Sequence, residues 1–151
     1  MKNALIRQYF KDEDLTAVSE KIRQTELTTS GEIRVSVKEK IPFLDDKKNL
    51  FERAKKEFFR LKMDQTRHKT GILIYIELMD RQFYILADSG INEKVPQQVW
   101  DGIRDEMVQH FKQGKFAEGI IFGIGEAGKI LSIHFPPGKE DKNELSNQME
   151  F

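Results

Sequence analysis

Several acidic side chains in predicted loops are candidate ligands for a metal ion. Asp88 and Glu93 lie in a polar segment after an apolar run, and Asp101 lies one turn into the next helical pattern. These three could converge at one sheet edge, where oxygen-only ligands suit Ca²⁺ and, less well, Mg²⁺. Taken alone, the same residues are better explained by ordinary turn and helix-start roles. Asp80 precedes the run, so we expect it roughly 25 Å away, at the other end of one strand.

Other familiar chemistries have no matching pattern. Zero cysteines exclude disulfides, thiol catalysis and thiolate metal sites. The three histidines never stand four residues apart, and no phosphate-binding loop follows an apolar run. The glycines of 123–128 imitate a dinucleotide fingerprint, but they fall inside a helical pattern. The sequence patterns therefore identify no catalytic residue.

The expected helices and strands follow from hydrophobic periodicity and turn residues. Alternation predicts a half-buried strand, whereas a continuous apolar run predicts one buried on both faces. Apolar residues at helical spacing predict helices, and Asp45 or Asp46 is a candidate N-cap for the second. The expected elements are a helix over 12–28, a strand over 32–38, a helix from 45 or 46 to 63, strands over 71–76 and 83–87, and helices over 96–113 and 116–134.

The order of these elements predicts an α/β fold. A strand–helix–strand unit implies a parallel crossover, and the tight turn at 79–82 adds an antiparallel neighbour. We therefore expect an α/β/α sandwich, a mixed sheet with helices on both faces. Four glycines within 116–134 predict close packing of that helix backbone on the sheet.

Composition limits the classes of function. The 151 residues suit a single domain over 1–135, followed by a polar, flexible tail over 136–151. The 25 basic and 25 acidic side chains cancel, which argues against a nucleic-acid partner. No run is long enough to span a membrane, and no secretory signal is recognisable. We expect a cytoplasmic protein, monomeric by default.

Four stretches together resemble the TPM domain family. They are 29–35, which begins Thr-Ser-Gly-Glu; the glycine, apolar strand and Asp-Arg of 71–81; the Asp-Ser-Gly-Ile of 88–91; and 111–120, which follows the pattern F-x-x-G-x-F-x-x-G-I. The resemblance covers roughly residues 12–135. Members include thylakoid-lumen proteins linked to photosystem II repair, one group described as acid phosphatases, and many bacterial proteins.

The resemblance implies an α/β/α sandwich and, in some members, calcium at loops on the sheet edge. That site would best match Asp88, Glu93 and Asp101, with Asp80 as a further candidate. The chain looks like the short, stand-alone bacterial subgroup, without a signal peptide or membrane helix. Phosphatase activity does not carry over by matching residues, because no nucleophile or base is identifiable.

Three functions follow as hypotheses. The first is a domain that binds a divalent cation, favoured as Ca²⁺ over Mg²⁺, and acts as a regulatory or interaction module. The second is a metal-assisted acid phosphatase acting on phosphomonoesters. The third is a module that only binds a protein partner, with Leu145 and Met149 of the tail forming one apolar face.

Overall fold

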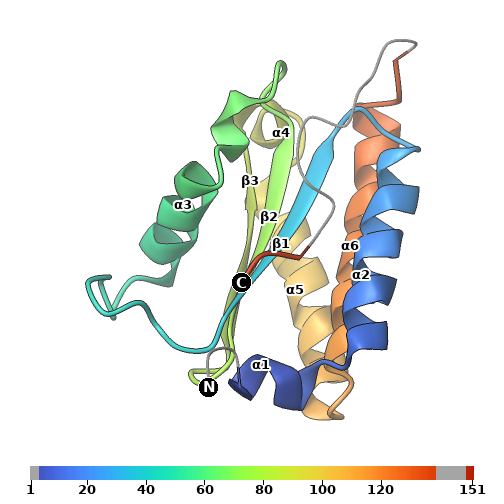
Figure 1. The fold of residues 1–151 in the computed structure, drawn as a ribbon. Helices are drawn as coiled ribbons and strands as arrows, with labels where there is room; N and C mark the ends of the chain where they lie inside the picture. Colours follow the sequence, from blue (N-terminus) through green and yellow to red (C-terminus); the bar gives the residue numbers. More distant parts are fainter. Residues whose placement is uncertain (1–3, 139–148) are drawn as a thin grey trace.

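The computed structural model describes residues 4–138 and 149–151 of the chain. One three-stranded sheet, in the order β1-β2-β3, stands between helices that cover both of its faces (Figure 1). The predicted α/β/α sandwich is therefore confirmed. Within these residues no helix combines the length and the apolar character that a membrane crossing needs.

The observed elements match most of the predicted bounds. The strands are β1 (Glu32–Lys38), β2 (Gly71–Glu77) and β3 (Gln82–Ala87). The helices are α1 (Ala4–Tyr9), α2 (Asp12–Glu26), α3 (Leu50–Arg60), α4 (Ser89–Asn92), α5 (Gln97–Lys112) and α6 (Phe116–His134), with a 3₁₀ turn, η1 (Met63–Gln65).

One helix begins later than the sequence predicts, and one short helix was not predicted. The second long helix begins at Leu50 because the Asn49 side chain accepts a hydrogen bond from the Glu52 N–H, 3.1 Å away. Asp46, a predicted cap, instead accepts from the Lys48 N–H in a local turn. The short helix α1 was not predicted, since its six residues are too few for a clear periodic pattern.

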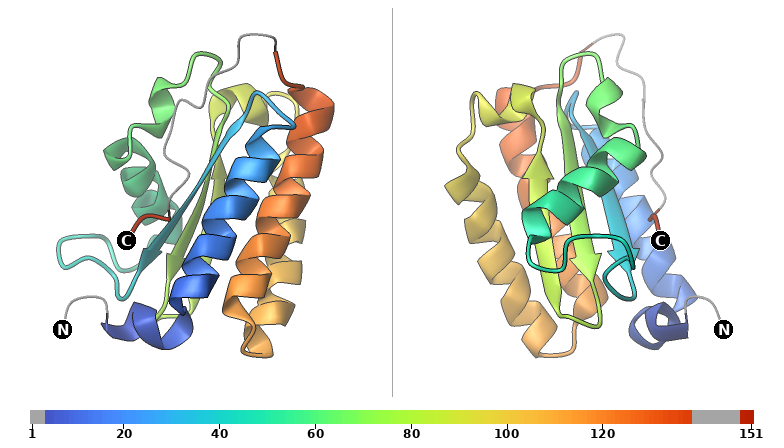
Figure 2. Two further views of the ribbon diagram at one scale, coloured as in Figure 1. Left: turned by 45° about the vertical axis from the view of Figure 1, so that its right-hand side comes forward. Right: turned by 90° about the vertical axis from the view of Figure 1, so that its left-hand side faces the viewer.

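The sheet topology follows the predicted crossover and hairpin. β1 and β2 pair in parallel, with Ile33 opposite Ile72, and α3 lies in the connection between them. β2 and β3 pair antiparallel, with Ile74 opposite Ile85. Figure 2 shows that the hairpin turn and the α5–α6 corner lie at the same end of the molecule, close to α1.

The main core lies between the sheet and the layer formed by α2, α5 and α6. Trp100 and Ile124 are fully buried there. The α6 glycines do permit close packing, but against neighbouring helices rather than the sheet. A Cβ on Gly123 would lie 2.5 Å from the Met107 sulfur of α5, and one on Gly128 would clash with the Thr25 side chain of α2.

The face under α3 combines a small core with buried charges. Arg53 and Glu77 form an ion pair with a 2.7 Å Nε–Oε2 distance, and both side chains are at most 1% exposed. The hydrogen bonds that Arg53 donates to Glu77 raise the pKa of Arg53, and burial opposes this shift. β1 was predicted to be half-buried, but Arg34 and Ser36 on this face are also buried. The covering helix and these polar contacts account for the difference.

The last three residues were expected to belong to a flexible tail, but they are held against the sheet. Glu150 makes a parallel bridge with Ser36 on the outer edge of β1. Two backbone hydrogen bonds of 2.8 Å hold it, from the Val37 N–H to the Glu150 carbonyl and from the Glu150 N–H to the Val35 carbonyl. Met149 is only 7% exposed. Leu145 and the other residues of 139–148 lie outside the described residues.

Candidate functional site: an aromatic cleft at the hairpin end

The predicted metal ligands are spread along the molecule. Asp80 is exposed in the hairpin turn, whereas Asp88 follows the far end of β3. Asp88 caps α4, because its Oδ1 accepts from the Ser89 N–H at 2.7 Å. Its Oδ2 is buried and accepts no hydrogen bond. One oxygen of this carboxylate is therefore committed to the backbone.

The other two carboxylates have separate surroundings. Glu93 ends α4 and faces solvent, and Asp101 accepts a hydrogen bond from Gln97 at 3.1 Å on α5. In the part of the chain that the structure describes, no three acidic, histidine or cysteine side chains are grouped to hold a metal ion. These donors therefore do not fit a preformed calcium site, and the calcium hypothesis stays a prediction.

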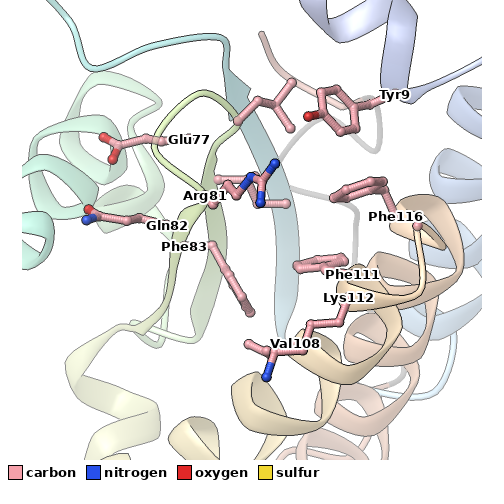
Figure 3. A pocket seen from close by; sticks show the side chains of 12 residues that line it. Tyr9, Glu77, Arg81, Gln82, Phe83, Val108, Phe111, Lys112 and Phe116 are labelled. Carbon is pink, nitrogen blue, oxygen red and sulfur yellow. The ribbon is translucent and has the colours of Figure 1, made fainter.

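A cleft of about 510 Å³ opens at the hairpin end of the sheet, between α1, the β2–β3 turn and the α5–α6 corner (Figure 3). Four aromatic rings form one wall and contact each other in the order Tyr9, Phe116, Phe111, Phe83. Successive ring centroids are 4.5, 5.5 and 5.1 Å apart. Such spacing is typical of favourable aromatic pairs, so the wall is ordered before any ligand arrives.

The α5–α6 corner positions two of these rings. Gly114 has a φ of +76°, a left-handed conformation that lets the chain reverse between the helices. Gly119 leaves room for Phe111, since a Cβ there would lie 2.6 Å from the ring. The F-x-x-G-x-F-x-x-G stretch thus builds the cleft wall, which explains its spacing.

Two cations flank the rings. Arg81 belongs to the hairpin turn and Lys112 to the last turn of α5. Figure 3 shows the Arg81 guanidinium facing the ring wall. Neither side chain forms an ion pair with a described residue. Glu77 also borders the cleft, but its carboxylate points away and is held by Arg53. The cleft therefore offers positive charge without an opposing carboxylate.

This arrangement has the features of a binding site. The rings can bury an apolar or aromatic side chain, and the cations can hold a carboxylate or phosphate. Among the residues that the structure describes, the lining contains no serine, threonine, histidine or aspartate that could act as nucleophile or base. Sequence analysis missed the cleft because its walls come from segments far apart in the chain. The available signals were the Asp80-Arg81 pair and the phenylalanine–glycine spacing of 111–119.

A buried carboxyl group, that of Glu26, lies near the start of β1, at the end of the sheet away from the cleft. Glu26 ends α2, and its Oε2 accepts from the Ile33 N–H at 2.8 Å. Burial, and then a hydrogen bond with the Glu32 carboxyl group, raises the pKa of Glu26 to about 9. A proton shared between two carboxyl groups accounts for this pairing at neutral pH.

Comparisons with known proteins agree on the family. No curated protein matches the chain. The solution structure of the BA42 protein from the psychrophilic bacterium Bizionia argentinensis is 40% identical and covers 96% of this chain and 97% of its own, with a TM-score of 0.85. The N-terminal domain of a P. gingivalis protein shares the fold, at 18% identity, 87% and 83% coverage and a TM-score of 0.70. The family model of the TPM domain matches residues 6–130, so the chain belongs to the TPM domain family.

Proposed function

We propose that this TPM domain is a protein-interaction module, and that the aromatic cleft receives an apolar or aromatic side chain of the partner. The observation that carries the proposal is the four-ring wall beside two cations without partners among the described side chains. Aromatic and aliphatic anchors in concave, partly apolar sites supply most of the free energy in many protein interfaces.

The test uses the anionic dye anilinonaphthalene sulfonate, which combines aromatic rings with a single negative charge. Val108 lines the cleft and is partly exposed, so Val108→Trp fills the cleft without removing a wall. Val99 is 37% exposed on the same helix and lines no described pocket, which makes Val99→Trp the matched control.

We expect Val108→Trp to weaken dye binding about tenfold or more, which corresponds to about 1.4 kcal/mol. Val99→Trp should change the affinity less than about twofold. Circular dichroism and urea unfolding establish that both variants are folded. Equal dye affinity of Val108→Trp and the unaltered protein would contradict the proposal.

Cation binding and phosphatase activity remain weaker proposals. Calcium binding predicts amide shifts at Asp88, Glu93 and Asp101 on titration with Ca²⁺, and Asp88→Asn should abolish them. Metal-assisted phosphatase activity predicts turnover of a simple phosphomonoester with metal present. No turnover at high enzyme concentration would remove it.

A further inference from the structure

A second recess continues the aromatic cleft along the outer edge of β3. It has a volume of about 440 Å³ and shares Arg81, Gln82, Phe83 and Val108 with the cleft. The recess adds three cations that come from two other segments: Lys47, Lys48 and Arg104. The lysine pair precedes α3 and lines this recess.

The recess carries an excess of positive charge. Over the described part of the chain, its lining contains four cations and no acidic residue. Among the described side chains, Lys47 and Lys48 form no ion pair, and Arg104 is 3.6 Å from the carboxylate of Asp105. The Arg104 Nε is buried and has no hydrogen-bond partner within residues 4–138 and 149–151. Cations gathered in this way repel each other, and an anionic ligand relieves that cost.

The backbone of β3 adds a donor and an acceptor to the same recess. The carbonyl groups of Ile85 and Ala87 point to the free edge, because they accept from the Gln97 and Asn92 side chains at 3.3 and 2.9 Å. Alternate residues of a strand face the same edge, so the Phe83 N–H and carbonyl also point there. No described group outside the sheet bonds to either of them. An extended peptide can therefore pair with β3 at Phe83.

The opposite edge of the sheet already holds a segment of this kind. There the chain's own end pairs with β1, buries Met149 and places the Glu150 carboxylate on Arg34. An extended segment with an apolar residue beside an acidic residue thus fits an edge of this sheet that carries a cation. This contact favours a peptide over a nucleotide or a lipid as the ligand of the β3 edge.

We infer that the partner of this domain presents an extended acidic peptide segment, which pairs with β3 at Phe83. Its aromatic residue occupies the cleft, and its carboxylates contact Lys47, Lys48 and Arg104. The inference rests on the proposed function, because it requires the cleft to hold the aromatic side chain. It adds the charge and the extended conformation of the ligand.

The experiment titrates the full chain with two fluorescein-labelled decapeptides. One carries a single phenylalanine flanked by glutamates, and the other has glutamines in place of all the glutamates. We expect the acidic peptide to bind about tenfold more tightly at low ionic strength, with a smaller difference at about 0.5 M salt because screening weakens charge pairs.

Two lysine pairs provide matched variants. The double substitution Lys47→Gln, Lys48→Gln removes two charges from the recess and should weaken binding of the acidic peptide about fivefold. The double substitution Lys55→Gln, Lys56→Gln removes two charges from α3, outside the recess, and should change it less than about twofold. Binding of the neutral peptide should be insensitive to both.

The outcomes separate the two proposals. Equal binding of both peptides in the cleft would overturn the acidic-peptide inference and leave the proposed function intact. Binding of neither peptide would overturn both. If vesicles of anionic lipid bind with the same dependence on Lys47 and Lys48 while the peptides do not, the ligand is a membrane surface and the inference is wrong.

Discussion

Replacing Glu26 by glutamine should remove a pH dependence of stability. Burial and the Glu32 carboxyl group raise the pKa of Glu26 to about 9 in the folded state, from 4.5 in the unfolded chain. Between these values the folded state binds a proton that the unfolded state lacks, so stability falls as pH rises. Glutamine cannot ionise, and its amide oxygen can still accept from the Ile33 N–H.

The magnitude follows from the width of this pH window. Each pH unit between the two pKa values changes the free energy of unfolding by up to about 1.4 kcal/mol. From pH 5 to pH 7.5 the unaltered protein should therefore lose up to about 3 kcal/mol relative to Glu26→Gln. Partial exposure and local relaxation reduce this upper bound.

Urea unfolding at pH 5 and pH 7.5 measures the difference. Glu20→Gln is the control, because Glu20 lies on the same helix, faces solvent and pairs only with neighbouring residues. The difference in the free energy of unfolding between Glu20→Gln and the unaltered protein should change by less than about 0.5 kcal/mol between the two pH values. A constant difference between Glu26→Gln and the unaltered protein at both pH values would refute the shared-proton account.

Four other changes should alter stability in urea unfolding. Gly102→Ala should stabilise the protein by about 1 kcal/mol, because nothing lies within 4 Å of the added Cβ on an α5 position. Gly90→Ala should instead destabilise it by about 2 kcal/mol or more, because its Cβ meets backbone carbonyl oxygens that cannot move easily. Glu77→Gln should cost about 3 kcal/mol, since it leaves a buried guanidinium without its carboxylate. Deleting 149–151 should cost about 2 kcal/mol, mainly through the lost burial of one methionine side chain. A rise in stability for any of the last three would contradict the packing described above.

The fold was predictable because its signals are local. The apolar run over 72–76 marked a strand buried on both faces, and the alternation over 32–38 marked its neighbour. The burial of Arg34 was not predictable, because it depends on residues that come from α3 and the chain end. Asn49 replaced the expected caps because three polar residues competed for one helix start.

The candidate site was less predictable because it depends on contacts between distant segments. Tyr9, Arg81 and Phe116 come from three separate parts of the chain and meet only in the fold. The motifs that contain Arg81 and Phe116 were visible in the sequence, but no local pattern indicated that these residues and Tyr9 line one cleft. The loop carboxylates drew attention because they are close in sequence. The described structure does not group them around one point.

The most direct test of the proposed function is to locate bound peptide on isotope-labelled protein by following backbone amide resonances. The probe is the acidic decapeptide with one phenylalanine. We predict the largest shifts at Phe83, Phe111 and Phe116, with small shifts at Asp88 and Asp101 at the opposite end of β3. Shifts confined to the Asp88–Asp101 segment, or no shifts at millimolar peptide, would contradict the assignment of the aromatic cleft as the binding site.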